Sequence, residues 1–158
     1  MTDARSGADV GDAELVERFS MVPVGRDNAE FYRGWLDHEL RMNRCADCGR
    51  WHHPPKPMCP FCWSWNVQPT PVSGRGTVYL LMLMHQGPPA TDVDYERSPH
   101  PVVVVDLDEE PGLRITSTVI DCPHEAVAIG MPVEVAWIER DGVPFPAFRP
   151  TASARVDS

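Results

Sequence analysis

The chain has 158 residues, 42% of them hydrophobic, which is enough for one compact domain or two small ones. Its formal net charge of −9, from 23 acidic and 14 basic residues, argues against a protein that binds nucleic acid mainly by neutralising phosphates. The N-terminal residues lack the apolar core of a signal peptide, and no run of about 18 apolar residues predicts a transmembrane helix. We therefore expect a cytoplasmic protein whose cysteines are reduced.

The beginning of the chain predicts a flexible arm that carries one short helix. Residues 1–26 open with small polar residues, and Asp12 is a plausible cap for a helix that follows it. The apolar face of this helix would consist of Leu15, Val16 and Phe19.

A second short helix is predicted to begin near Asn28, and it carries large aromatic side chains. Phe31 and Trp35 fall on one face of this helix, and Tyr32 lies alongside them. Such a face either packs on the body of the domain, which is its more ordinary role, or docks a partner protein. Phe31, Tyr32 and Trp35 are accordingly the candidate docking residues.

Two C-x-x-C pairs predict that residues 27–71 hold a zinc ribbon behind this helix. The pairs are Cys45–Cys48 and Cys59–Cys62, and ten residues separate them. Each pair can form a tight knuckle, so that four thiolates surround one Zn²⁺ tetrahedrally. Four protein ligands leave no open coordination position, so this zinc would be structural rather than catalytic. Two disulfides or a thioredoxin-like redox pair are the alternatives, and the paired spacing in a chain without a secretion signal favours the metal.

The residues near the cysteines predict how the ribbon is completed. Gly49 suits the left-handed turn that a knuckle often needs. His52 or His53 could replace a cysteine as a ligand, although four sulfurs already suffice. Trp63 and Trp65 are expected to cover the metal site or the domain junction.

The remainder of the chain, residues 72–150, predicts a five-stranded, partly open barrel of the OB type, followed by a tail at 151–158. The sequence Asp141-Gly142 is a signal for a hairpin between the last two strands. Residues 123–130, before the fourth strand, have the length of one helical turn. The predicted strands span residues 72–84, 102–107, 113–120, 133–138 and 145–148.

Two places in this region carry groups that could take part in catalysis. A long loop from His85 to His100 contains Asp92, Asp94 and Glu96, which could supply acid–base groups, but a solvated loop that contacts a partner is the simpler interpretation.

The second place is Cys122, which could act as a nucleophile with His124 as its base. The neighbouring Asp121 and Glu125 would raise the pKa of the thiol, so an inert cysteine is favoured.

The order of several short motifs resembles the family known as domain of unknown function 35, the acyl-CoA-associated OB-fold proteins with a rubredoxin-like zinc ribbon. The resemblance covers about residues 28–150 and begins with the aromatic helix and the two cysteine pairs. The motifs that follow are Pro54-Pro55-Lys56, Gly74-x-Gly76-Thr77-Val78-Tyr79, Val103-Val104-Val105-Asp106-Leu107, Ile129-Gly130-Met131-Pro132-Val133-Glu134-Val135 and Pro146-Ala147-Phe148-Arg149-Pro150.

This resemblance implies a non-catalytic accessory or scaffold subunit of a hetero-oligomer. Members of the family accompany thiolase-like enzymes, including acyltransferases, synthases, lyases and aldolases, and also hydratases of steroid side-chain degradation. The partner supplies the reacting groups, so no catalytic residue is carried over to this chain. The small subunit can help to bind the CoA moiety, whose phosphates need local positive charge. Candidates for that contact are Lys56, Arg75, Arg97 and Arg149.

A module that binds single-stranded nucleic acid is the alternative function, because ribbons and OB barrels often use aromatic side chains and a basic groove for this purpose. Residues 41–62 hold four basic residues against one acidic residue, which gives +3. Residues 72–150 hold five basic residues against twelve acidic ones, which gives −7 and argues against this function. A stand-alone enzyme that uses Cys122 or the loop histidines is the third hypothesis.

Overall fold

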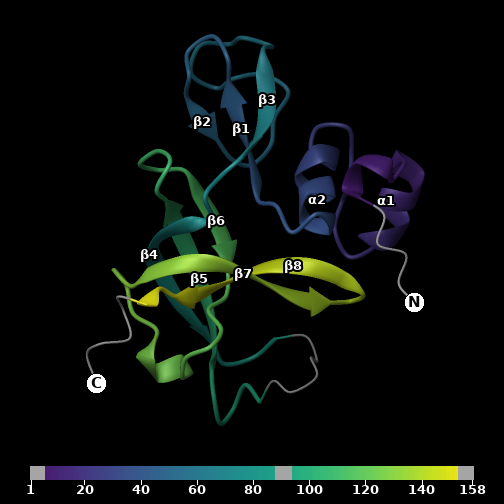
Figure 1. The fold of residues 1–158 in the computed structure, drawn as a ribbon. Helices are drawn as coiled ribbons and strands as arrows, with labels where there is room; N and C mark the ends of the chain where they lie inside the picture. The colour runs from purple at the N-terminus through teal and green to yellow at the C-terminus, as the bar shows by residue number, and fades with distance from the viewer. Residues whose placement is uncertain (1–5, 88–93, 153–158) are drawn as a thin grey trace. The chain divides into compact units, whose positions relative to one another are not determined.

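The computed structural model describes residues 6–87 and 94–152 (Figure 1). The chain forms two compact units. One contains the residues up to Ser73 together with Trp137–Pro146, and the other contains Gly74–Ala136 together with the residues from Ala147 onward. Within the described residues, no helix is both long enough and apolar enough to cross a membrane.

The first unit begins with helical segments that pack together. Residues 6–19, which the sequence assigned to a flexible arm, bury Val10, Leu15 and Phe19. The carboxylate of Asp37 accepts hydrogen bonds from the Ser6 hydroxyl at 3.0 Å and from the Gly7 N–H at 2.7 Å. These segments are the 3₁₀ helix η1 (Gly7–Asp9) and the helices α1 (Asp12–Arg18) and α2 (Ala29–Leu36).

Two details of α1 differ from the sequence prediction. Gly11, not Asp12, occupies the N-cap, and no side chain caps the helix. Asp12 instead accepts a hydrogen bond from the guanidinium of Arg33, because an ion pair with α2 is available to its carboxylate. Val16 is 50% exposed, so the buried face of α1 is narrower than predicted.

The ribbon of the first unit is a three-stranded antiparallel sheet with the strand order β2-β1-β3. The strand β1 (Arg41–Cys45) leads into the first knuckle. The sequence did not predict β2 (Trp51–His52), which is only two residues long, or β3 (Val67–Pro71), which contains Pro69. Proline lacks the N–H that a central strand needs, and β3 accommodates it as an edge strand.

Most of the second unit is a five-stranded sheet with the order β6-β5-β4-β7-β8, and the hairpin end of β7 and β8 (Trp137–Pro146) belongs to the first unit. The five predicted strands are confirmed. A parallel bridge between Val119 and Phe148 curls the sheet toward a half-open barrel. The predicted hairpin turn is also confirmed, with left-handed φ values of 52° at Asp141 and 79° at Gly142. The strands are β4 (Arg75–Met84), β5 (His100–Leu107), β6 (Arg114–Ser117), β7 (Pro132–Arg140) and β8 (Val143–Pro150), and the predicted helical turn is η2 (His124–Ala126).

The core of the second unit lies on one face of this sheet. Residues along β5 alternate between buried and half-buried, and Val103, Val105 and Leu107 point into the core. Although residues 102–105 are all valine, only one face of this strand is fully buried, because an antiparallel sheet needs cover on one face only. A bulge at Tyr79 interrupts the pairing of β4 with β5.

Candidate metal centre

The first knuckle begins where β1 ends. The Gly49 N–H donates to the Cys45 carbonyl at 2.9 Å, and the Cys45 N–H donates to the Arg50 carbonyl at 2.9 Å. Gly49 has the predicted left-handed backbone, with φ of 75°. No atom lies within 4 Å of the point where a Cβ would stand, so backbone conformation rather than crowding favours glycine here.

The second knuckle repeats this hydrogen-bond pattern. The Cys59 N–H donates to the Ser64 carbonyl at 2.8 Å, and the Trp63 N–H donates to the Cys59 carbonyl at 3.0 Å. Trp63, at the position equivalent to Gly49, also has a left-handed backbone, with φ of 65°. Asp47 of the first knuckle joins the two halves, because its carboxylate accepts hydrogen bonds from the Ser64 hydroxyl and from the side-chain amide of Asn66.

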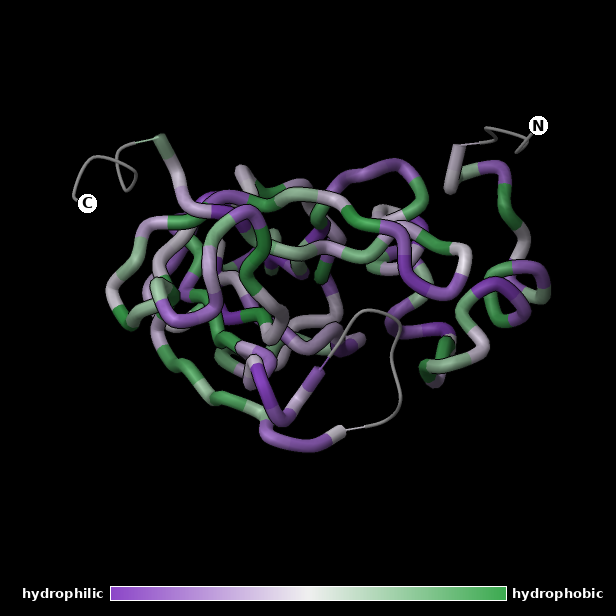
Figure 2. The backbone as a smooth tube through the Cα atoms, turned by 90° about the horizontal axis from the view of Figure 1, so that it is seen from below, coloured by the Kyte–Doolittle hydropathy of each residue, from purple (hydrophilic) through white to green (hydrophobic). Residues whose placement is uncertain are grey.

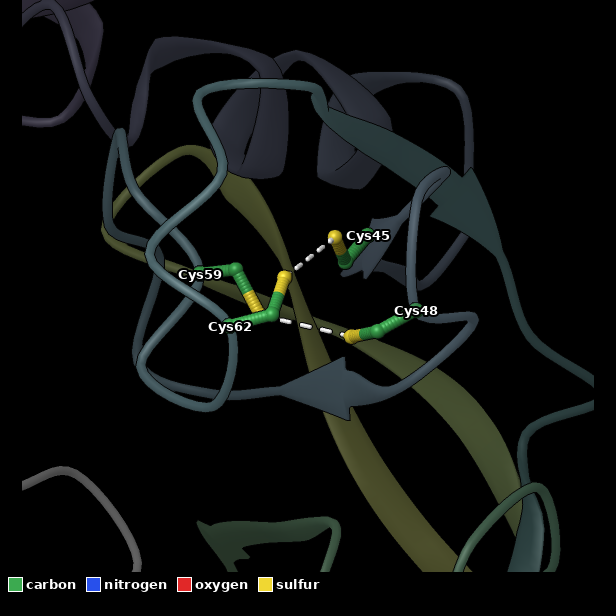
Figure 3. Close-up of side chains that lie close together, drawn as sticks. All are labelled: Cys45, Cys48, Cys59 and Cys62. Atoms are coloured by element: carbon green, nitrogen blue, oxygen red, sulfur yellow. Dashed lines mark hydrogen bonds between the residues drawn. The ribbon is translucent and has the colours of Figure 1, made fainter.

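The two knuckles bring all four sulfurs to one point (Figure 3). The Sγ atoms of Cys45 and Cys62 are 3.6 Å apart, those of Cys48 and Cys59 are 3.7 Å apart, and the four lie within 4.8 Å of one another. A disulfide joins sulfurs at about 2.05 Å, so these cysteines form no disulfide. Four sulfurs that are each about 2.3 Å from a central Zn²⁺ lie about 3.8 Å apart in a tetrahedron. The four cysteines thus form a group suited to one metal ion.

The thiols of this group do not all ionise near neutral pH by themselves. The backbone N–H of Cys48 is the main cause that lowers the pKa of Cys45 to about 7. At Cys62 the backbone N–H of Ser64 favours the thiolate, but partial desolvation of the sulfur by its neighbours and the three neighbouring thiols outweigh it and raise the pKa to about 12. A bound divalent cation would supply the positive charge that four close thiolates need. The donor set therefore fits a thiophilic metal held by the four cysteines.

The two histidines between the knuckles lie outside the sulfur cluster. Among the described residues, the group of possible ligands consists of the four cysteines alone. His53 packs its ring against Phe31, with 5.1 Å between the ring centroids. Burial, aided by the nearby His52, lowers the pKa of His53 to about 4, so its imidazole is neutral at pH 7.

The tryptophans of the second knuckle do not cover the metal site, so that part of the prediction is wrong, while a place at the domain junction stays a prediction. Trp63 and Trp65 are each 73% exposed, whereas the sulfur-bearing Cys45 and Cys59 are fully buried. Other parts of the ribbon therefore enclose those two cysteines. Phe61 is also exposed, and the Arg50 guanidinium lies 3.9 Å from the centre of its ring. The second knuckle thus presents three exposed aromatic side chains.

A hollow of about 380 Å³ beside the first knuckle was not predicted. Its wall combines residues of β1 and the knuckle with residues of β3. Because β3 contains prolines and was not expected to be a strand, no sequence pattern predicted that these residues meet. The lining residues are Arg44, Cys45, Ala46, Gly49, Gln68 and Thr70.

The aromatic side chains of α2 mostly form the core of the first unit. Phe31 and Trp35 are buried, and the Trp35 ring packs edge-on against Phe145 at 5.5 Å. Tyr32 is half-buried and lies 5.0 Å from the ring of Phe19. Phe31 and Trp35 therefore serve to pack the helix on its own unit. A docking role stays a prediction, and Tyr32 is the residue of the three whose side chain is exposed enough for it.

The four candidate cations are all exposed, but their surroundings differ. Arg75 of β4 is aligned with Glu134 of β7, and Arg149 donates to the Glu134 carboxylate at 3.0 Å. Arg97 is 90% exposed and lies in the loop before β5, near Asp94. Lys56 lies between the knuckles, and no ion pair is assigned to it within residues 6–87 and 94–152. The structure brings Arg75 and Arg149 together at Glu134.

Of the candidate catalytic groups, His100 and His124 lie close together, with 5.8 Å between their ring centroids, and no contact between His124 and Cys122 is assigned in the described residues. His124 pairs through Nδ1 with the Ser98 hydroxyl at 2.9 Å. Burial, aided by the charge of Asp121, raises the pKa of Cys122, in agreement with the expectation of an inert thiol. His85 is exposed, and Asp92 lies outside the described residues.

Two family models match consecutive parts of the chain. Residues 33–67 match "ChsH2, rubredoxin-like zinc ribbon domain", and residues 69–138 match "ChsH2, C-terminal OB-fold domain". The predicted order of a zinc ribbon followed by an OB fold is therefore confirmed.

Proteins with similar sequences carry names of enzyme subunits and scaffolds. A "Probable enoyl-CoA hydratase alpha subunit" of Thermomonospora curvata is 34% identical over 129 residues, which cover 80% of this chain and 38% of that protein. The chain thus spans well under half of that relative's length. A "DUF35 domain-containing scaffold protein" of Methanocaldococcus jannaschii is 35% identical over 103 residues, which cover 63% of this chain and 69% of that protein.

A solved structure named "Ltp2-ChsH2(DUF35) aldolase" has a similar fold. It superposes with a TM-score of 0.72 and 32% sequence identity. The match covers 83% of this chain and 99% of the matched chain, so the similarity extends over both the ribbon and the barrel.

Proposed function

The chain belongs to the DUF35 family of ChsH2-type proteins, and on this premise we propose that it is a non-catalytic accessory subunit of an enzyme that acts on acyl-CoA. Its partner would be a thiolase-like subunit, such as a lyase, aldolase or acyltransferase, that supplies the reacting groups. The observation that carries this proposal is the closed group of four cysteines. Four sulfur ligands leave a metal no open position for a substrate, so the centre can stabilise the fold but not activate a substrate.

We take the metal to be Zn²⁺, bound by Cys45, Cys48, Cys59 and Cys62. The sulfur spacing and the all-thiolate donor set suit Zn²⁺, and iron in a rubredoxin-like site is the competitor with the same ligands. Elemental analysis of the purified protein distinguishes the two metals. A colourless and redox-inactive protein would also indicate Zn²⁺ rather than iron. One zinc per chain is expected, and iron as the bound metal would contradict the assignment.

The accessory role is tested by coexpressing the chain with neighbouring thiolase-like proteins. We expect a stable complex, acyl-CoA turnover by that complex, and no turnover by this chain alone. Turnover by the isolated chain would contradict the proposal. Failure to capture any thiolase-like protein would also count against it.

A contribution to CoA binding is the finer part of this proposal. Lys56 and Arg97 are the best placed of the four candidate cations. No ion pair is assigned to Lys56 in the described residues, and Arg97 is 90% exposed although its guanidinium lies 3.7 Å from the Asp94 carboxylate, whereas Arg149 pairs with Glu134 and Arg75 is aligned with the same residue. Lys56→Glu and Arg97→Glu are expected to weaken CoA binding by the complex, and Arg26→Glu, an exposed change at another site, serves as the control. Equal CoA affinity in all three variants would remove these residues from the CoA site.

Single-stranded nucleic acid is a second candidate ligand, favoured by one observation. Trp63 and Trp65 are exposed on a locally basic ribbon, and exposed aromatic rings are stacking platforms for bases. The acidic residues 72–150 weigh against it. Binding to a single-stranded oligonucleotide that weakens with salt and is lost in Trp63→Ala would support this alternative.

A further inference from the structure

The outer half of β4 carries an apolar surface that the metal centre does not involve. The six residues from Tyr79 to Met84 read Tyr-Leu-Leu-Met-Leu-Met and include no charged side chain. Figure 2 shows the end of this run as a continuous hydrophobic stretch that leads toward the grey trace after β4. Exposed fractions are 49% at Tyr79, 37% at Leu80, 53% at Met82 and 49% at Leu83.

One edge of this half of β4 has no strand beside it. On one side, Leu80–Met84 pair with residues of β5. On the other side, β7 pairs only with Arg75–Thr77, and the last backbone hydrogen bonds join Val78 to Gly130 and Met131. Beyond Val78, no strand or backbone hydrogen bond is assigned to this edge within the described parts of the chain.

Both faces of the same segment are apolar as well. Leu81 and Leu83 stand opposite Val103 and Pro101, which point into the core, so these leucines lie on the core-side face. Leu80 and Met82 therefore lie on the opposite face, because side chains alternate along a strand. Natural edge strands are usually protected by lysine, proline or a bulge. Leu80–Met84 contain neither lysine nor proline, and the bulge lies before them, at Tyr79.

We propose that this edge pairs with the same edge of a second copy of the chain. A two-fold axis perpendicular to the sheet would place Met82 opposite Met82 of the second copy, and Leu81 opposite Leu83. In this register each residue meets one from the equivalent face, so the segment is self-complementary. Two chains of net charge −9 repel each other, and this uncharged strand is a place where they approach without opposing like charges.

The small size of the paired segment sets the strength of this association. Five residues of one edge bury less than the roughly 1,200 Å² of a typical stable interface. The dimer is therefore expected to form reversibly and to depend on concentration. It does not depend on the proposed enzyme partner.

Sedimentation velocity over a concentration series tests the dimer. We expect the wild-type chain to shift from monomer to dimer as concentration rises, and Met82→Lys to remain monomeric because it introduces two like charges at the two-fold axis. Met21→Lys, at an apolar residue that is 78% exposed in the other unit, is the matched control and should still dimerise. Metal content and circular dichroism verify that each variant is folded.

A cysteine at the same position tests the register. Met82→Cys in a Cys122→Ser background should form a disulfide-linked dimer on mild oxidation, with the linked peptide identified by mass spectrometry, whereas Met21→Cys should not. A wild-type chain that stays monomeric over the whole series, or a dimer that persists in Met82→Lys, would overturn the inference. Either outcome leaves the capture of a thiolase-like partner unaffected, so the two proposals fail separately.

Discussion

The two knuckles of the ribbon have the same backbone pattern but different surroundings. In each, the first cysteine is buried, the second is exposed, and the fifth residue is left-handed and donates its N–H to the first cysteine's carbonyl. The first knuckle connects β1 to β2 and places Gly49 at the left-handed position. The second knuckle lies between β2 and β3 and has Trp63 there, with Phe61 and Trp65 also exposed.

The comparison shows that the metal fixes the positions of the sulfurs but not the residue type at the left-handed position of each knuckle. Both knuckles meet the same geometric demand, since two sulfurs must point at one ion from each side. Only the second places a bulky residue in a conformation that costs an L-amino acid about 1–2 kcal/mol. A strained and exposed tryptophan contributes little to the fold around it, so we interpret the second knuckle as the surface-presenting half of the ribbon.

Removing one ligand should have the largest effect and should break both knuckles together. Cys59→Ala leaves three sulfurs, and structural zinc contributes on the order of 10 kcal/mol to the folding of small zinc domains. We expect loss of the metal and unfolding of the ribbon, measured by metal analysis and near-UV circular dichroism. Cys122→Ala, which changes a cysteine outside the cluster, should keep its metal. An assembled, active complex containing Cys59→Ala would show that the ribbon is dispensable.

Acid should weaken the segment that links the knuckles, through His53. Its pKa is about 4 in the folded chain against 6.5 when unperturbed, so below pH 6.5 the unfolded state binds the proton first. The free energy of unfolding should therefore fall between pH 6.5 and pH 4, by about 3 kcal/mol in all. Denaturant titrations of wild type and His53→Gln at several pH values measure the contribution of His53 as the difference between their free energies of unfolding. Protonation of the thiolates affects both proteins equally and cancels in this difference. Identical pH dependence in the two would contradict it.

The sequence predicted the structure best where a residue type has one usual structural role. The C-x-x-C pairs predicted the sulfur cluster, and Asp141-Gly142 predicted a turn that needs left-handed residues. It failed where tertiary pairing decides, as at β3, where β1 accepts a proline-containing neighbour as an edge. It also failed at Trp65, because composition does not reveal which side of a knuckle faces solvent. The unpaired edge of β4 likewise follows from where β7 diverges, which no local pattern encodes.

Gly49→Ala should damage the first knuckle by a smaller amount. A Cβ at this position would meet no neighbouring atom, so the cost is the left-handed backbone alone, about 1 kcal/mol. We expect a lower midpoint of chemical unfolding for the ribbon with an unchanged metal content. Ala46→Gly, an exposed position in the same knuckle, controls for altered backbone flexibility. An unchanged midpoint in Gly49→Ala would mean that metal binding sets the backbone regardless of residue type.

Trp63→Gly should change the free energy of unfolding least. We expect a small gain in stability here, in contrast to the loss expected for Gly49→Ala in the first knuckle. Glycine removes the left-handed strain but loses about 0.5–1 kcal/mol of backbone entropy, so the net gain is expected to be below about 1 kcal/mol. Trp63→Ala keeps the strain and removes the ring, so it should be less stable than Trp63→Gly by about 1 kcal/mol. If both variants are equally destabilised, the ring supports the fold after all. If both fold normally but no longer capture a partner, Trp63 is retained for the surface it presents, since the metal site alone would favour glycine.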